Sequence, residues 1–156
     1  MTYRLNVLDL FCGCGGASIG LINAGQKIVG AVDIDATACE VYERNLGLKP
    51  LCRDLKYLNG EKILKAFDLK KDDIDLIVGC PPCQGFSSLR RTKYPDCTDK
   101  RKSLVTTFIH RVQEIQPKAV MFENVTGIIR KEGKIYFNKL IRKLEKMGYS
   151  QLVIWE

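Results

Sequence analysis

Short apolar runs alternate with longer amphipathic stretches along this chain, and turn-forming residues separate them. Short runs bounded by glycine, proline or aspartate are typical of buried strands, whereas apolar residues at helical spacing are typical of helices. The expected strands are residues 5–10, 28–32, 50–52, 74–78, 118–122 and 150–156. The expected helices begin near residue 17 and then cover residues 36–45, 59–67, 103–115 and 126–147, the last with a break around residues 132–133. This order predicts an α/β fold with a doubly wound, mostly parallel sheet and right-handed crossovers.

Composition and charge narrow the class of protein. The chain has 156 residues, of which 46% are hydrophobic and 28% are charged, as expected for one soluble globular domain. No apolar run approaches the roughly 20 residues of a membrane span, and the N-terminal residues do not resemble a signal peptide. We therefore expect the seven cysteines to be reduced intracellular thiols. The net charge of +7 is compatible with a polyanionic partner but does not by itself identify one.

A glycine-rich turn follows the first expected strand. Gly13 and Gly15 would let the backbone approach a ligand at the start of a helix. Asp33 lies 20 residues after Gly13, which is the spacing of an acidic residue that binds ribose hydroxyls in a nucleotide-binding βαβ unit. Ser18 stands where the dinucleotide fingerprint has its last glycine, so an adenosine-containing cofactor other than a nicotinamide or flavin is favoured. A purely structural glycine turn is the alternative.

A cysteine is held just beyond the fourth expected strand by two prolines. Pro81 and Pro82 cannot continue a sheet interior, so they form a stiff platform for Cys83. Ligands of open α/β sheets bind beyond the carboxyl ends of the strands, and a thiol presented there is a candidate nucleophile. Because Cys80 and Cys83 form a C-x-x-C pair, a redox pair, half of a metal site and a plain structural cysteine are the alternatives.

Two further features follow along the chain. Glu123 comes directly after the fifth expected strand, where a carboxylate would suit acid catalysis at the same sheet edge as Cys83, or would only cap a helix. Residues 88–102 read as a long polar loop whose basic side chains could contact phosphates; a solvated loop is the alternative.

Together these motifs resemble those of the C5-specific cytosine DNA methyltransferases, over essentially the whole chain. The matching segments are Asp9 to Gly16, Asp33-Ile34, Asp54-Leu55, Gly79 to Ser87, Asp99 to Leu104 and Glu123 to Val125. The pairing of Pro-Cys-Gln with Glu-Asn-Val is the specific part of the resemblance. It implies the Rossmann-like fold of S-adenosylmethionine-dependent methyltransferases.

The resemblance also implies catalytic roles. Cys83 would add to carbon 6 of a cytosine that has left the base stack, and Glu123 would hold the ring at N3 and the exocyclic amine. Asn124 would order the loop that carries Cys83, and Pro82 would contact the base or the cofactor. The implied DNA contacts are Gln84, Ser87, Arg90, Arg91 and Arg101, and no metal is implied.

For the cofactor, S-adenosylmethionine, the resemblance implies a set of binding residues. Asp33 would bind the ribose hydroxyls, Ile34 the adenine face and Asp54 the adenine amine. The rest of the implied pocket is Asp9, Phe11, Gly13, Gly15, Leu55 and Leu104.

The expected domain is residues 1–156, a cofactor-binding catalytic domain that is incomplete at its C-terminal end. The family pattern continues with an arginine motif and a target-recognition region. The chain is therefore expected to be half of a split enzyme, a truncated fragment that is inactive alone, or a non-catalytic module that binds cofactor or DNA. The implied partners are cytosine-containing DNA in a DNA methylation or restriction–modification system, and a second polypeptide supplying recognition, with no membrane. The implied location is cytoplasmic and nucleoid-associated in a prokaryote, or nuclear in a eukaryote.

Overall fold

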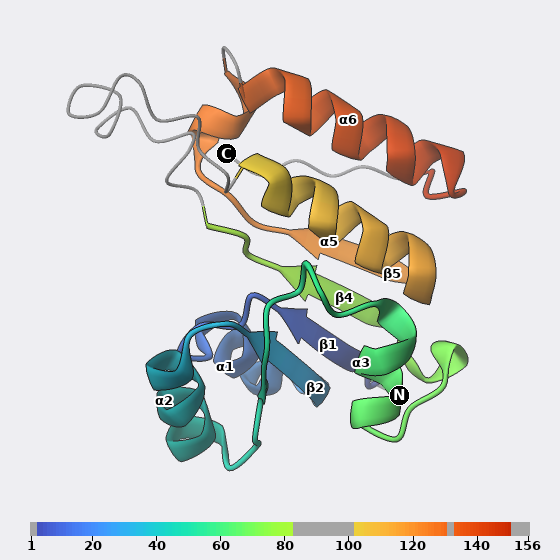
Figure 1. Cartoon of the computed structure of the whole chain (residues 1–156). Coiled ribbons are helices and arrows are strands. Elements are labelled where there is room, and N and C mark those ends of the chain that lie inside the picture. Colours follow the sequence, from blue (N-terminus) through green and yellow to red (C-terminus); the bar gives the residue numbers. More distant parts are fainter. Residues whose placement is uncertain (1–2, 83–101, 131–132, 151–156) are drawn as a thin grey trace, which may run out of the picture.

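The computed structural model describes residues 3–82, 102–130 and 133–150. Its centre is a five-stranded sheet in the order β3-β2-β1-β4-β5, and every pairing is parallel (Figure 1). The strands are β1 (Asn6–Leu10), β2 (Lys27–Asp33), β3 (Leu51–Cys52), β4 (Leu76–Gly79) and β5 (Ala119–Phe122). The predicted α/β fold with a doubly wound parallel sheet is confirmed. Residues 151–156 of the sixth expected strand lie outside the described residues.

The helices begin and end where local signals place them. They are α1 (Gly16–Asn23), α2 (Ala36–Leu46), α3 (Gly60–Ala66), α5 (Lys102–Ile115) and α6 (Gly133–Lys146), with 3-10 turns η1 (Lys71–Asp73) and η3 (Thr126–Ile129). The Asp35 side chain accepts from the amide of Ala38 at 3.0 Å and caps α2. No helix in these described segments is long and apolar enough to cross a membrane.

The predicted break in the last helical stretch has a packing cause. A Cβ on Gly133 would lie 2.4 Å from the carbonyl oxygen of Gly127 and 2.6 Å from the Cα of Ile128. Only glycine lets α6 begin against the backbone of η3, so the stretch is divided into a 3-10 turn and an α-helix.

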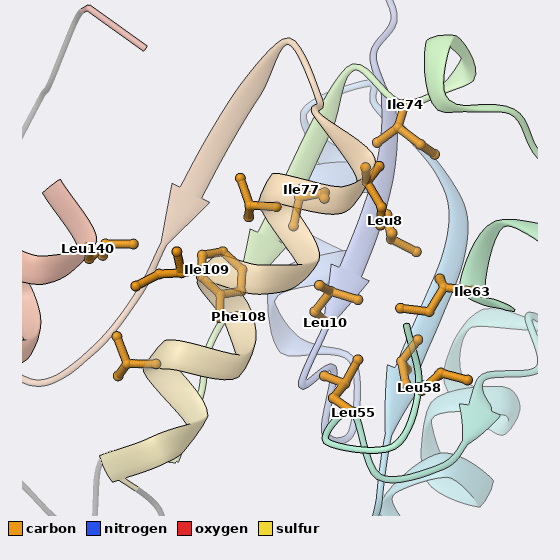
Figure 2. Close-up of a cluster of buried hydrophobic side chains, with 14 of the residues drawn as sticks. Leu8, Leu10, Leu55, Leu58, Ile63, Ile74, Ile77, Phe108, Ile109 and Leu140 are labelled. Carbon is orange, nitrogen blue, oxygen red and sulfur yellow. The ribbon is translucent and has the colours of Figure 1, made fainter. Parts of the chain in front are cut away.

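Alternate residues of the strands face two different helical layers. On one face, Leu8, Leu10 and Ile77 belong to the main core, which includes Phe108 of α5 and Leu140 of α6 (Figure 2). On the other face, residues of β1, β2 and β4 pack against α1, and Ala31 of β2 packs against Tyr42 of α2. The members of these two smaller clusters are Val7, Ile28, Leu76 and Val78, and Cys12, Ala31 and Tyr42.

The sheet changes winding direction between β1 and β4. These strands are neighbours, although β2 and β3 separate them in sequence, so the chains leaving their carboxyl ends diverge (Figure 1). Such a switch point is where open α/β sheets bind ligands.

An ion pair fastens the opposite edge of the sheet. The Asp75 carboxylate accepts from the amide of Asn6 at 2.8 Å and from Lys118 Nζ at 2.6 Å. The Asn6 amide hydrogen bond and the Lys118 cation lower the pKa of Asp75 below its ordinary value. This contact joins the starts of β1, β4 and β5, far along the strands from the switch point.

Candidate active site

Three strands bring their carboxyl ends together at the switch point. Leu10 of β1 pairs with Gly79 of β4, and Gly79 pairs with Phe122 of β5. Beyond these residues, the amide of Cys80 donates to the carbonyl of Leu10 at 3.4 Å, and the amide of Glu123 donates to the carbonyl of Gly79 at 3.0 Å. The proline–cysteine loop therefore starts beside Glu123, at one sheet edge.

Cys80 is a thiol rather than a thiolate in this setting. Burial, the nearby charges of Asp9 and Glu123, and a hydrogen bond with the Glu123 side chain raise the pKa of Cys80 to about 12. A thiol with so high a pKa is a poor nucleophile at neutral pH. Cys80 is therefore a neighbour of Glu123 rather than a candidate nucleophile.

Asn124 connects the end of β5 to the proline loop. Its side-chain amide donates to the carbonyl of Pro81 at 3.0 Å, and its side-chain oxygen accepts from the amide of Val125 at 3.1 Å. Pro81 is buried whereas Pro82 is exposed. The start of the loop is thus anchored at Pro81 by Asn124, which is the residue that follows Glu123 in the sequence.

Asp9 is a fully buried carboxylate within β1. Its Oδ2 accepts from the hydroxyl of Ser18 at 2.5 Å, and Ser18 in turn accepts from the hydroxyl of Tyr42 at 2.8 Å. Its Oδ1 has no hydrogen-bond partner among the described residues. Burial, with a smaller contribution from the charge of Asp33, raises the pKa of Asp9 to about 6, although the Ser18 hydrogen bond opposes the shift.

Asp33 organises the glycine-rich turn. Its Oδ2 accepts from the amide of Gly13 at 2.8 Å, and its Oδ1 accepts from the amide of Asp35 at 3.0 Å. Each carboxylate oxygen keeps capacity for another donor. Ile34, the next residue, is 65% exposed and presents an apolar surface beside this carboxylate.

The two glycines of the turn, Gly13 and Gly15, differ in what surrounds them. Gly13 has φ 51°, and a Cβ there would have nothing within 4 Å, so its surface is open to a ligand. Gly15 has φ 95°, and a Cβ there would lie 3.0 Å from Leu46 and 3.1 Å from Tyr42. The side of Gly15 that lacks a Cβ therefore allows close packing against α2.

The remaining predicted cofactor residues are Phe11 after β1, Asp54 and Leu55 after β3, and Leu104 in α5. Asp54 is half-buried, and its Oδ1 accepts from the amide of Lys56 at 2.9 Å. The side chain of Leu55 is buried in the main core, and Phe11 and Leu104 are half-buried. Sequence reasoning missed Arg111 and Glu114 of α5, which contact the segment after Asp54.

Several predicted site residues lie outside the described residues: Cys83, Gln84, Ser87, Arg90, Arg91 and Arg101. Within the described ranges, no group of three or more histidine, cysteine, aspartate or glutamate side chains could hold a metal ion.

The raised pKa of Asp9 gives a stability prediction. Between the ordinary pKa of 3.8 and about 6, the folded state binds more protons than the unfolded state, so stability falls as pH rises. We expect wild type to lose about 2 kcal/mol of unfolding free energy, relative to Asp9→Asn, from about pH 4.5 to about pH 7.5. Urea unfolding of both proteins across this range measures the difference. Parallel pH profiles would contradict the raised pKa.

Comparison with known proteins assigns the chain to a family. The sequence pattern of the family described as C-5 cytosine-specific DNA methylase matches residues 5–154. The Type II methyltransferase M.XorII of Xanthomonas oryzae pv. oryzae is 33% identical over 144 residues, which cover 92% of this chain and 33% of that protein. The Type II methyltransferase M.AplI of Arthrospira platensis is 36% identical over 146 residues, which cover 94% of this chain and 38% of that protein. The chain thus spans between a third and two-fifths of the length of these relatives.

Solved structures agree with this assignment. A protein described as a DNA modification methyltransferase encoded within an E. coli prophage matches with a TM-score of 0.75 and 36% identity, over 92% of this chain and 38% of that chain. The Dnmt2 methyltransferase of S. pombe matches with a TM-score of 0.63 and 26% identity, over 90% of this chain and 40% of that chain. With its pattern match over residues 5–154 and its parallel sheet, the chain belongs to the C-5 cytosine-specific DNA methylase family.

Proposed function

We propose that this chain supplies the cofactor-binding and catalytic part of a DNA (cytosine-5-)-methyltransferase that uses S-adenosylmethionine and Cys83. The observation that carries the proposal is the joining of Glu123-Asn124 to the proline–cysteine loop. The Asn124 amide donates to the carbonyl of Pro81 at 3.0 Å, so the described start of the loop is tied to the residue that follows Glu123. This contact supports the proposal, because a nucleophile and an acid that act on the same base must lie close together.

The described residues fit the proposed cofactor. The sulfonium and ammonium groups of S-adenosylmethionine are cationic, and the unpartnered Oδ1 of buried Asp9 would favour positive charge nearby. Asp33 has free acceptor capacity for ribose hydroxyls, and exposed Ile34 offers an apolar surface for adenine. Gly13 leaves open space beside the turn. When bound, the cofactor supplies an activated methyl group.

The proposed chemistry uses the protein groups in a fixed order. The Cys83 thiolate adds to carbon 6 of an unstacked cytosine, which places electron density on carbon 5. Glu123 binds N3 and the exocyclic amine, offsetting the charge that develops on the ring. Carbon 5 would gain the methyl group as the S–CH3 bond of the donor breaks, leaving S-adenosylhomocysteine. A water molecule acting as base then takes the carbon-5 proton, and the electron pair of that C–H bond restores the ring double bond and expels the Cys83 thiolate, releasing 5-methylcytosine. Asn124 and Pro82 position the loop and the base.

We propose that methylation of DNA also requires the part of the relatives that this chain does not cover. Because the chain spans between a third and two-fifths of those relatives, recognition of a DNA sequence is assigned to a further segment or a second polypeptide. A cofactor-binding module without catalysis is a second candidate, favoured because Asp9 and Asp33 are held by Ser18 and the glycine-rich turn, without any hydrogen bond from the proline–cysteine loop among the described residues.

The test measures cofactor binding and methyl transfer separately. Calorimetry with S-adenosylhomocysteine measures binding, and mass spectrometry detects 5-methylcytosine in mixed-sequence DNA incubated with S-adenosylmethionine. With the remaining part of a relative added, we expect product from wild type and none from Cys83→Ala, whereas Cys80→Ala should still form product because its thiol is not the nucleophile. Binding without product, even when the remaining part of a relative is added, would favour the non-catalytic module. Equal product from wild type and Cys83→Ala would overturn the proposed nucleophile.

A further inference from the structure

Arg111 is a buried cation in the middle of α5, where the helix faces the main core. It is 8% exposed, and its Nη1 donates to the backbone carbonyls of Leu55, at 3.3 Å, and Leu58. Its Nη2 donates to Glu114 Oε1 at 3.0 Å. A buried guanidinium is costly unless its donors are used. Nη1 and Nη2 are used, whereas Nε has no hydrogen-bond partner among the described residues, so these contacts offset part of the cost and indicate a specific role for the residue.

Glu114 contacts the chain a short distance after Leu55 and Leu58. Its Oε2 accepts from the amide of Gly60, the first residue of α3, at 2.6 Å. A Cβ on Gly60 would lie 2.9 Å from the Cβ of Glu114, so glycine is needed for this approach. The Arg111–Glu114 pair therefore holds both ends of residues 55–60, which include most of the connection between β3 and α3 and the first residue of α3.

Asp54 lies directly before this clamped segment. Its Oδ1 accepts from the amide of Lys56 at 2.9 Å, and its backbone carbonyl accepts from the amide of Tyr57 at 3.1 Å. Asp54 and the first residues of the segment thus form one tight turn. The side chains of Leu55 and Leu58 are buried in the core, and their backbone carbonyls accept from Arg111. The guanidinium therefore fixes the position of this turn relative to α5.

We propose that Arg111 and Glu114 are positioning residues for the methyl donor, acting through the turn that carries Asp54. The inference rests on the proposed function, and on the binding of the adenine amine by Asp54 that the resemblance to the family implies. It adds that α5, which also carries Leu104 of the proposed pocket, sets the place of that carboxylate. The pair touches no substrate and acts only through the backbone of residues 55–60.

The test is a double-mutant cycle on cofactor affinity. Glu114→Gln removes the charge facing Arg111 and leaves one amide oxygen where two carboxylate oxygens had accepted separate bonds. We expect this change to weaken S-adenosylhomocysteine binding about fivefold in the wild-type background and not at all in an Asp54→Ala background. A second variant, Arg111→Lys, keeps the charge but cannot contact both carbonyls and Glu114, and should behave in the same way.

A cofactor analogue supplies a readout that a structural role alone would not move. S-inosylhomocysteine has an oxygen in place of the adenine amine, so wild type should prefer the adenosyl compound and Glu114→Gln should lose much of that preference. The matched control is Lys118→Gln, which removes the ion pair with Asp75 at the opposite edge of the sheet. It should lower the melting temperature without changing either affinity.

The outcomes separate this inference from the proposed function. If wild type binds the cofactor and the Arg111 and Glu114 variants fold and bind equally well, the positioning role is overturned while the proposed function stands. Equal losses in the wild-type and Asp54→Ala backgrounds would also overturn it, because the pair would then act by another route. If folded wild type binds no cofactor, both proposals fail.

Discussion

Replacing Glu123 with glutamine is expected to slow cytosine methylation by about a hundredfold to a thousandfold. The proposed role of Glu123 is to bind the ring at N3 and the exocyclic amine while charge develops on the base. A neutral amide has nearly the same shape but cannot carry the proton or the charge of a carboxyl group. The measurement is kcat for methyl transfer, with cofactor affinity and melting temperature expected to stay near wild type.

The same substitution has a readout that does not require activity. Glu123 raises the pKa of Cys80 through its charge and its hydrogen bond. Glu123→Gln should therefore lower the pKa of Cys80 below about 12, while burial and Asp9 still hold it above its ordinary value. Alkylation of the Cys80 peptide against pH, followed by mass spectrometry, reports this change. An unchanged alkylation profile would show that the two side chains do not interact.

Gly79→Ala is expected to lower the unfolding free energy by about 3 kcal/mol. A Cβ at this position would lie 2.2 Å from the ring of Phe108, which is fully buried. The ring also packs against that of Phe122, with centroids 5.4 Å apart, so it has little freedom to move away. Chemical unfolding followed by circular dichroism measures the loss.

Gly20→Ala is the matched control for that prediction. It makes the same chemical change in α1, where a Cβ would meet nothing within 4 Å. Because alanine has the higher helix propensity, this variant should be as stable as wild type or more stable, by up to about 1 kcal/mol. Similar losses in both variants would show that steric contact with Phe108 is not the cause.

The fold was predictable from sequence because its signals are local. Apolar runs ended by turn residues mark the strands, and Asp35 marks the start of α2 within three residues of the amide that it caps. The ends of β4 and β5 were also predictable as neighbours, because parallel strands direct their carboxyl ends to one edge. The sequence therefore predicts that the proline loop and Glu123 lie at the same edge of the sheet.

The supporting contacts were not predictable because they join distant segments. In the sequence, Ser18 differs from its neighbours only as a departure from a glycine pattern, yet its hydroxyl donates to Asp9 and accepts from Tyr42, which is 24 positions away. Arg111 reaches Leu55 across 56 positions, and neither residue carries a local signal for the other. A charged residue on the apolar face of a predicted helix is the one clue that the sequence offered.

The strands that carry the two parts of the site differ in how readily they open locally, because they occupy different positions in the sheet. β1 is paired on both sides, with β2 and β4, whereas β5 pairs only with β4 among the described residues and leaves Met121 46% exposed. Amides of edge strands exchange with solvent through smaller openings than those of central strands. Asp9 therefore belongs to the most slowly exchanging part of the sheet and Glu123 to a more readily opened margin. The proposed cofactor half of the site is therefore expected to persist while the half proposed to hold the base fluctuates.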